Sequence, residues 1–445
     1  MPKLFGTDGI RGVSNREITP EVAYNLGKAV AIWLRSQYVG KKPLVAVGQD
    51  TRTSSSMLFT ALSSGLMAHG ADVLYLGVLP TPGLALLTKH FGANAAVMVS
   101  ASHNPMADNG LKVLNAHGFK LSEPEEETLE SIMFENRRGV EWQDIGQLQY
   151  VPNSNDIYGD IILQRTGLAL EELPVVVDVA HGATHASAPY VLRKAGARVH
   201  VLYATPDGYW INNDCGATNL ESLRQVVQVL RVPIGFAFDG DGDRVLAVSR
   251  NGRIIDGDDI MAIIVRYLMH KGAWEPKLVV GTVMTNGGFE DFLRASGGRL
   301  IRTRVGDKYV ADAMQESGAL LGGEPSGHII YTRVNSTGDG VGIMAMLLKI
   351  LSELNAEPEE LLQDVAKKAQ KTVNIRLERK MNGDFLDRHP HLQQEIEHYG
   401  TMGIRIVLRP SGTEPLLRLT VEGDEEQVDV VLDDLVSKVQ GLLKE

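Results

Sequence analysis

The chain of 445 residues repeats one β-loop-α-β pattern three times, and this repeat constrains its fold more than any other feature. Each copy begins with an apolar run, passes through a polar or glycine-rich loop into a segment of helical periodicity, and returns to a second apolar run. The three opening runs are residues 43–48, 174–179 and 277–283. Because unbroken apolar strands suit sheets that crossover helices cover on both faces, we expect three similar α/β domains with mixed, largely parallel sheets.

The pattern changes near residue 369. Residues 372–377, 404–408 and 417–421 alternate apolar with polar side chains, and a segment of helical periodicity fills residues 424–443. Alternation is typical of strands with one buried face, so the sequence predicts a smaller C-terminal α+β domain. The expected domains are residues 1–152, 153–253, 254–368 and 369–445.

The net charge and the cysteine content bear on which partners the protein can bind and in which compartment it works. The chain carries 44 Lys and Arg against 55 Asp and Glu, a formal net charge of −11, so it lacks the basic character expected of a nucleic-acid binder. The single cysteine, Cys215, can form neither an intramolecular disulfide nor a thiolate cluster, which favours a reducing compartment. Residues 1–6 turn glycine-rich without offering the apolar core of a signal peptide, and we find no uninterrupted apolar stretch of about 18 residues. We expect a cytoplasmic protein that binds no nucleic acid and no membrane.

Three aspartates alternate with glycines in the motif Asp-Gly-Asp-Gly-Asp-Arg, directly after the apolar strand 234–238. In α/β proteins this end of a strand is where ligands bind, and carboxylates so close together repel each other unless a cation neutralises them. A calcium loop of the EF-hand type is excluded, since Arg244 and Arg250 stand where that loop needs Gly and Glu. The motif therefore predicts a Mg²⁺ site, with a phosphate as a further ligand, at Asp239, Asp241 and Asp243.

A serine occupies a similar place after another apolar strand. Ser102 follows residues 97–99, His103 is its neighbour, and Lys112 follows within reach of the same turn. No Gly-x-Ser-x-Gly elbow surrounds the serine, which disfavours a Ser-His dyad for acyl transfer. Taken alone, this hydroxyl is compatible with an ordinary loop residue.

Further glycine-flanked loops offer groups for a phosphorylated sugar. Residues 322–328 present a carboxylate, a hydroxyl and an imidazole, a set that suits sugar hydroxyls or a turn that simply faces water. Residues 409–418 combine glycine backbone N–H groups, hydroxyls and two guanidinium groups, the inventory of a phosphate-binding loop. Two more loops, near residues 5–12 and 305–309, each add a cation. The candidate residues are Arg11, Lys308, Glu324, Ser326, His328, Arg409, Ser411, Gly412, Thr413 and Arg418.

In this order, from Phe5 to the C-terminus, the segments resemble the α-D-phosphohexomutase superfamily, and the opening Phe-Gly-Thr-Asp-Gly-Ile-Arg-Gly most resembles its phosphoglucosamine mutase branch. The resemblance implies four domains around a central cleft. It also implies an isomerase that interconverts glucosamine 6-phosphate and glucosamine 1-phosphate through a phosphoserine and a sugar 1,6-bisphosphate, feeding UDP-N-acetylglucosamine synthesis. A phosphomannomutase or phosphoglucomutase with the same mechanism, a Mg²⁺-dependent sugar phosphatase and a non-catalytic binding module are the alternatives.

The resemblance also implies roles for individual residues. Ser102 becomes the phosphoserine and thereby a further ligand of Mg²⁺, of which one ion per subunit is expected. Arg244 stabilises the moving phosphoryl group, His103 orients the serine, and either Lys112 or His328 moves the sugar hydroxyl proton. Glu324 and Ser326 bind the sugar, and the loop from Arg409 to Arg418 binds phosphate. The expected partners are sugar phosphates, with glucosamine or glucose 1,6-bisphosphate as activator; a homodimer is a compatible assembly.

Overall fold

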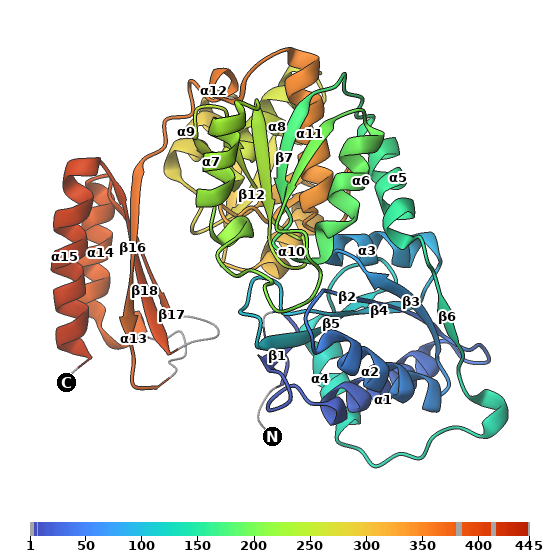
Figure 1. Cartoon of the computed structure of the whole chain (residues 1–445). Coiled ribbons are helices and arrows are strands. Elements are labelled where there is room, and N and C mark those ends of the chain that lie inside the picture. The colour runs from blue at the N-terminus through green and yellow to red at the C-terminus, as the bar shows by residue number, and fades with distance from the viewer. Residues whose placement is uncertain (1–3, 7, 380–384, 411–414, 444–445) are drawn as a thin grey trace.

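The computed structural model describes residues 4–6, 8–379, 385–410 and 415–443, and these form four sheets, each with its own helices (Figure 1). The predicted class is confirmed, because three α/β units with mixed, largely parallel sheets precede a smaller C-terminal unit with an antiparallel sheet.

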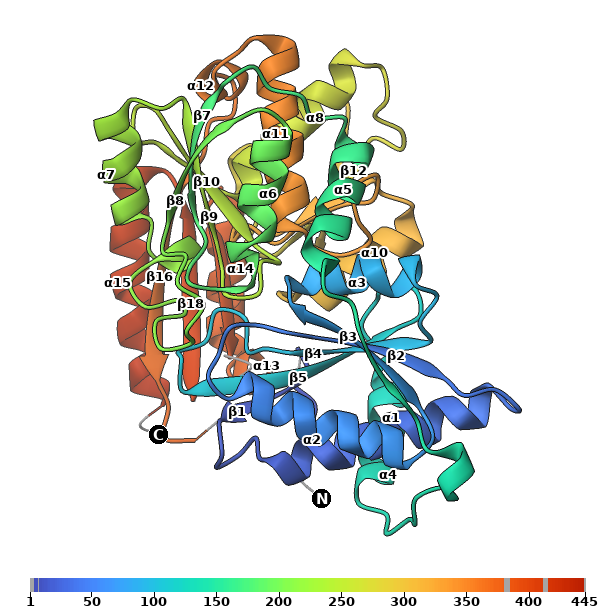
Figure 2. The ribbon, with the colours of Figure 1, turned by 45° about the vertical axis from the view of Figure 1, so that its right-hand side comes forward.

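The first sheet is mixed. Strand β2 pairs in parallel with β3 and β4, whereas β5 runs antiparallel to β4 and to β1. Helices α1, α2 and α4 cover one face of the sheet and α3 covers the other (Figures 1 and 2). The strands in sheet order are β1 (Ile10–Val13), β5 (Asp108–Asn115), β4 (Ala95–Val99), β2 (Leu44–Gln49), β3 (Asp72–Val78) and β6 (Leu148–Tyr150). The helices are α1 (Pro20–Gln37), α2 (Ser55–Ala68), α3 (Thr81–His90) and α4 (Glu123–Met133).

The second and third sheets repeat the parallel centre. Strand β7 pairs in parallel with β8 and β9, and β12 with β13 and β14. The second unit holds α5 (Ser154–Thr166), β7 (Pro174–Asp178), α6 (Ser187–Lys194), β8 (Arg198–Leu202), α7 (Glu221–Leu230), β9 (Ile234–Phe238), β10 (Val245–Ser249) and β11 (Ile254–Ile255). The third holds α8 (Gly257–His270), β12 (Leu278–Thr282), α9 (Gly287–Ala295), β13 (Arg299–Thr303), α10 (Asp307–Ser317), β14 (Leu321–Gly323), β15 (Ile329–Tyr331), α11 (Gly340–Leu354) and α12 (Pro358–Leu361).

The fourth sheet is antiparallel, in the order β16-β18-β17, and α14 and α15 cover the face that points away from the rest of the molecule (Figure 1). Its elements are β16 (Ala369–Arg376), α13 (Phe385–Arg388), α14 (Pro390–Thr401), β17 (Arg405–Pro410), β18 (Leu416–Gly423) and α15 (Glu425–Leu442). Short 3-10 turns at Trp142–Asp144, Ala183–His185 and Gly216–Thr218 complete the described secondary structure.

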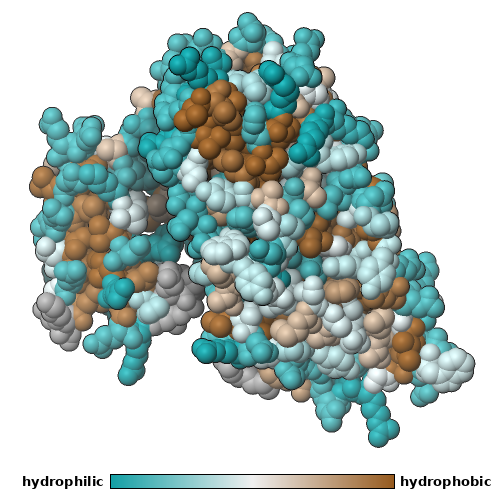
Figure 3. All heavy atoms as spheres, in the orientation of Figure 1, coloured by the Kyte–Doolittle hydropathy of each residue, from teal (hydrophilic) through white to brown (hydrophobic). Residues whose placement is uncertain are grey.

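The first three units share apolar packing, whereas the fourth has a core of its own. One continuous buried cluster contains residues of α3, α5, α6, α8 and α11, and a separate cluster lies between β16–β18 and the helices α14 and α15. The fourth unit contacts the third through Arg405, whose Nη2 donates to the Thr285 carbonyl at 2.8 Å, and through Glu422, which accepts from the Gly287 N–H at 3.1 Å. Hydrophilic side chains predominate where the two parts face each other in Figure 3. The helices described include none long and apolar enough to cross a membrane.

Candidate active site

Ser102 lies in the loop between β4 and β5, with 1% of its surface exposed. Its backbone adopts a left-handed φ of +52°, an unfavourable conformation for a residue with a Cβ. Its Oγ donates a hydrogen bond to Asp239 Oδ2 at 2.6 Å, although the two residues are 137 positions apart in the chain. The serine and the aspartate motif, which come from different sheets, therefore meet in one site.

The aspartate motif occupies the turn between β9 and β10. One oxygen from each carboxylate lies within 4.8 Å of the others, and Asp239, Asp241 and Asp243 are all buried. Burial and repulsion from the other two carboxylates raise the pKa of Asp239 well above its usual range. One oxygen of Asp241 and one of Asp243 have no hydrogen-bond partner within the described chain. A hard divalent cation would satisfy these oxygens, so the donor set fits Mg²⁺.

Lys112 on β5 is a buried cation against these acids. Its Nζ lies 2.8 Å from Asp241 Oδ2 and 3.1 Å from Asp8 Oδ2. Burial alone would lower the pKa of Lys112, but the carboxylates of Asp241 and Asp8 raise it above its ordinary value. The pKa of Asp8 is itself held well below its usual range, since the charges of Lys112, Lys120 and Arg11 outweigh the effect of burial. Lys112 is therefore charged in the folded protein.

Arg244 and His328 lie beside Asp243, on backbone segments joined by an isolated β-bridge. The Nδ1 of His328 lies 3.6 Å from Asp243 Oδ2. Burial opposes protonation, but the hydrogen bond and charge of Asp243 raise the pKa of His328 to about 9. Burial likewise opposes the charge of Arg244, and Asp239 and Asp243 raise its pKa. Both groups are cations at neutral pH.

His103 differs from His328 in its charge. Its Nδ1 lies 3.4 Å from Ser102 Oγ. Burial, together with the nearby charges of Arg244 and Arg11, lowers the pKa of His103 to about 4. A neutral imidazole therefore stands beside the serine at neutral pH.

The predicted sugar and phosphate groups lie on several loops. Glu324 Oε1 accepts from the Gly306 N–H at 3.2 Å, and Ser326 in the same loop is exposed. Arg409 and Arg418 are opposite each other on β17 and β18. Burial and the charge of Arg418 lower the pKa of Arg409, while the charge of Glu324 raises it, so these loops interact electrostatically. Ser411, Gly412 and Thr413 lie outside the described residues.

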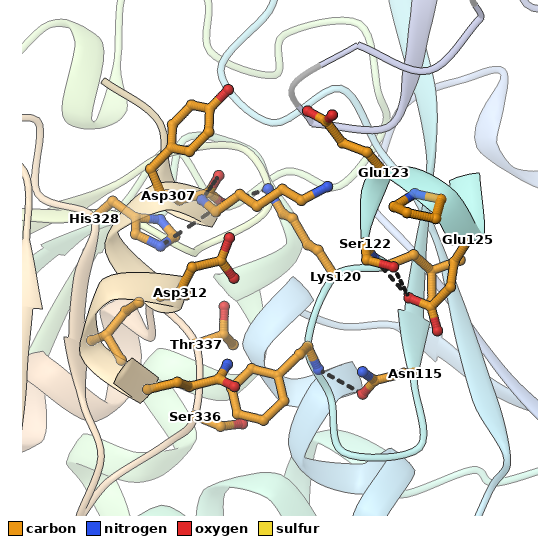
Figure 4. A pocket seen from close by; sticks show the side chains of 18 residues that line it. Asn115, Lys120, Ser122, Glu123, Glu125, Asp307, Asp312, His328, Ser336 and Thr337 are labelled. Carbon is orange, nitrogen blue, oxygen red and sulfur yellow. Dashed lines mark hydrogen bonds and ion pairs between the residues drawn. The ribbon is translucent and has the colours of Figure 1, made fainter. Parts of the chain in front are cut away.

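A pocket of about 420 Å³ adjoins this site between the first and third units (Figure 4). Lys308 and His328 line it together with Lys120, whose ammonium group forms ion pairs with both Asp8 and Asp307. Lys120 thus links Asp8, which precedes β1 and its Arg11, to the first turn of α10, which carries Lys308. Arg11 itself reaches the serine loop through Asn104 Oδ1 at 3.4 Å.

Several residues of the site were not predicted from the sequence. They are Asp8, Asp50, Arg52, Thr81, Lys120, Asn212 and Asp307. A signal for two of them was available, because Asp50 and Arg52 follow β2, the parallel neighbour of the strand that precedes Ser102. The carboxyl ends of adjacent parallel strands meet at one edge of a sheet.

Cys215, the single cysteine, is packed inside the second unit. The residue is fully buried, and burial raises the pKa of its thiol to about 12. It therefore stays protonated at neutral pH and is a poor nucleophile.

Comparison with known proteins agrees with this architecture over the whole chain. The phosphoglucomutase/phosphomannomutase alpha/beta/alpha domains I, II and III match residues 2–139, 156–252 and 256–369, and the C-terminal domain of that family matches residues 357–438. The phosphoglucosamine mutase of Moorella thermoacetica is 41% identical, covering 99% of this chain and 100% of the relative. That of Alkaliphilus oremlandii is 38% identical and covers 99% of each chain.

Solved structures show the same fold. A phosphoglucomutase/phosphomannomutase family protein from Burkholderia thailandensis superposes with a TM-score of 0.81 at 23% identity, covering 99% of this chain and 97% of that one. Aspergillus fumigatus N-acetylphosphoglucosamine mutase, solved in complex with GlcNAc-6P and magnesium, gives 0.62 at 16% identity, covering 98% and 94%. The chain therefore belongs to the phosphoglucomutase/phosphomannomutase family of the α-D-phosphohexomutases.

Proposed function

We propose that this protein is a phosphoglucosamine mutase, which interconverts glucosamine 6-phosphate and glucosamine 1-phosphate. The observation that carries the proposal is the 2.6 Å hydrogen bond from Ser102 Oγ to Asp239 inside a cluster of buried acids. Full-length relatives of about 40% identity that bear this name support the choice of sugar.

Asp239, Asp241 and Asp243 would hold Mg²⁺, and a phosphate on Ser102 would supply a further oxygen ligand. Bound there, the ion would neutralise charge on the phosphoryl group that is transferred. Arg244 adds a guanidinium beside the acids, with its Nε 3.9 Å from Asp243 Oδ1. Its place beside the cluster supports a role in stabilising the transferred group.

In the proposed cycle, the bond between phosphorus and Oγ of phosphorylated Ser102 breaks as a bond to a sugar hydroxyl oxygen forms. The hydroxyl gives up its proton, and Ser102 Oγ ends protonated. The bisphosphate then turns end for end, and its other phosphoryl group returns to Ser102 while the released sugar oxygen regains a proton. The site thus begins and ends each cycle with a phosphoserine, and a sugar 1,6-bisphosphate would prime an unphosphorylated chain.

Either Lys112 or His328 is proposed to move the proton of the sugar hydroxyl in this cycle. Each is charged at neutral pH and lies against one of the acids, and the group that donates a proton in one direction accepts it in the other. His103, neutral beside Ser102, is proposed to orient the hydroxyl.

The remaining loops are proposed to bind the two ends of the substrate. Glu324 and Ser326 would contact the sugar hydroxyls. The loop from Arg409 to Arg418, with Arg11 and Lys308, would bind the phosphate that is not being transferred. Because the bisphosphate must bind in two orientations, we propose that these loops surround a central cleft between the four domains predicted above.

Incubation of the purified protein with Mg²⁺, glucose 1,6-bisphosphate and glucosamine 6-phosphate, followed by phosphorus NMR, tests the proposal. We expect glucosamine 1-phosphate to form and Ser102→Ala to abolish its formation. Ser437→Ala, which changes an exposed serine on α15, is the matched control and should retain activity. Release of inorganic phosphate equal to substrate loss would identify a phosphatase, and a dominant preference for glucose or mannose 6-phosphate would identify the rival mutases.

A further inference from the structure

A fully buried arginine lies beneath the serine loop and has no part in the cycle described above. The side chain of Arg52 has no exposed surface, and its Nε donates to Asp50 Oδ2 at 2.9 Å. Its Nη2 donates to the carbonyls of Ser102 and Asn104 at 2.9 and 2.8 Å, and its Nη1 donates to the Asp108 carbonyl at 2.9 Å. One guanidinium group therefore holds the backbone at the serine and on its C-terminal side.

A second side chain, from the adjacent α/β unit, binds the same two carbonyls. Asn212 Nδ2 donates to the Ser102 carbonyl at 2.8 Å and to the Asn104 carbonyl at 3.2 Å. The segment that carries Asn212 packs closely on the loop of Arg52, since a Cβ on Gly208 would lie 2.4 Å from the Thr51 carbonyl oxygen. Two donors from different sheets thus share two acceptors on one turn.

The conformation held in this way is an unfavourable one. A left-handed serine persists only where its surroundings determine its backbone, and the N–H of Ser102 is also fixed, because it donates to Ser100 Oγ at 2.9 Å. Ser100 Oγ in turn donates to Asp50 Oδ2 at 2.6 Å. Both backbone polar groups of Ser102 are therefore held, which fixes the position of its Cβ, and from there its Oγ donates to Asp239 Oδ2 at 2.6 Å.

We infer that Arg52 and Asn212 are positioning residues, which hold Ser102 in the left-handed conformation that directs its Oγ at the metal-binding acids. The inference rests on the proposed function and adds to it. The hydrogen bonds that both side chains make within the described chain end on Asp50 and on loop carbonyls, not on the proposed sugar and phosphate loops. Losing them should therefore lower kcat much more than it raises KM.

The decisive variants are Asn212→Ala and the isosteric Asn212→Asp, assayed for steady-state mutase activity together with Tm. We expect Asn212→Ala to lower kcat about tenfold and to change KM by less than about twofold. A small displacement of the nucleophile lowers the rate of the chemical step strongly. Asn212→Asp keeps the shape but turns an oxygen toward two carbonyl oxygens, so its kcat should fall further. Arg52→Lys keeps the positive charge but lacks the several N–H donors of the planar guanidinium. We expect it to lower kcat about a hundredfold.

Asn355→Ala is the matched control. Asn212 and Asn355 both have a left-handed backbone, with φ +60° and φ +47°. Asn355 lies at the exposed C-terminal end of α11, so replacing it should change Tm without affecting the serine loop. Wild-type kcat in Asn212→Asp, or a loss in Asn212→Ala no larger than in Asn355→Ala, would overturn the inference, as would a rise in KM at unchanged kcat. If Arg52→Lys does not fold, the kinetics of Asn212→Ala and Asn212→Asp decide whether the inference holds. Absence of mutase activity in the wild type would instead refute the proposed function.

Discussion

Replacement of Asp258 by asparagine should make the protein less sensitive to alkaline pH. Asp258 lies in the first turn of α8 with 1% of its surface exposed, and its Oδ2 accepts from the Asn286 N–H at 2.8 Å. Its other oxygen is buried without a hydrogen-bond partner in the described chain. Burial and repulsion from Asp256 and Asp259, only partly offset by Lys367, raise the pKa of Asp258 to about 8.

The direction of the effect follows from proton linkage. Between about pH 4 and pH 8 the folded state keeps a proton on Asp258 that the unfolded chain has lost, so the free energy of unfolding falls as pH rises. Each pKa unit corresponds to about 1.4 kcal/mol, and a shift of about four units therefore removes up to about 5 kcal/mol by pH 8. The amide side chain of the Asp258→Asn variant would keep the acceptor for the Asn286 N–H and would carry no charge at any pH.

Thermal unfolding of wild type and Asp258→Asn at several pH values between about 5 and about 9 measures this difference. We expect the two Tm values to be close at the acid end and the variant to gain several degrees over wild type by about pH 9. The comparison with wild type at each pH removes the contribution of other groups, such as Asp178, whose pKa burial raises to about 6. A constant Tm difference across the range would refute the assigned protonation of Asp258.

Three further outcomes are expected. Asp241→Asn should abolish the rise in Tm that Mg²⁺ gives the wild type, while EDTA should remove wild-type activity; a Mg²⁺-dependent rise in the variant would contradict the proposed ligand set. Lys120→Met removes the ion pair with Asp8 inside the first unit and the ion pair with Asp307 of the third unit, and it should raise KM for sugar phosphate about tenfold; an unchanged KM would show that this link does not shape the substrate loops. Tyr158→Phe removes the 2.6 Å hydrogen bond to buried Asp339, so unfolding should become easier by about 1–3 kcal/mol at unchanged kcat, measured by calorimetry and steady-state assay.

The buried strands, the antiparallel C-terminal sheet and the two loops at strand ends could be predicted, because each has a signal in its local sequence. Strands β2, β7 and β12 are buried on both faces, so their apolar runs identified them, and the change to alternation near residue 369 identified the antiparallel sheet. Ser102 and the aspartate motif each lie just after such a strand, so the strand ends indicated both as candidate site residues.

The contacts of the supporting residues could not be found in the same way, although the end of β2 gave a signal for Asp50 and Arg52. Arg52 and Asn212 act on carbonyl groups 50 and 110 residues away, and a carbonyl carries no sequence signal. Asp8 and Lys120 are 112 residues apart, and their ion pair exists only because the fold brings them together. An arginine or asparagine in a polar loop is usually solvated, so only the tertiary contacts distinguish these residues from ordinary loop residues.

The separate apolar cluster of the fourth unit has a consequence for how such enzymes diversify. Apart from the polar contacts that Arg405 and Glu422 make with the third unit, substitutions within β16–β18 and their helices alter apolar packing that the first three units do not share. The strands bearing Arg409 and Arg418 can thus accumulate sequence changes, or be exchanged as a block between related proteins, while the apolar packing of the first three units is inherited intact.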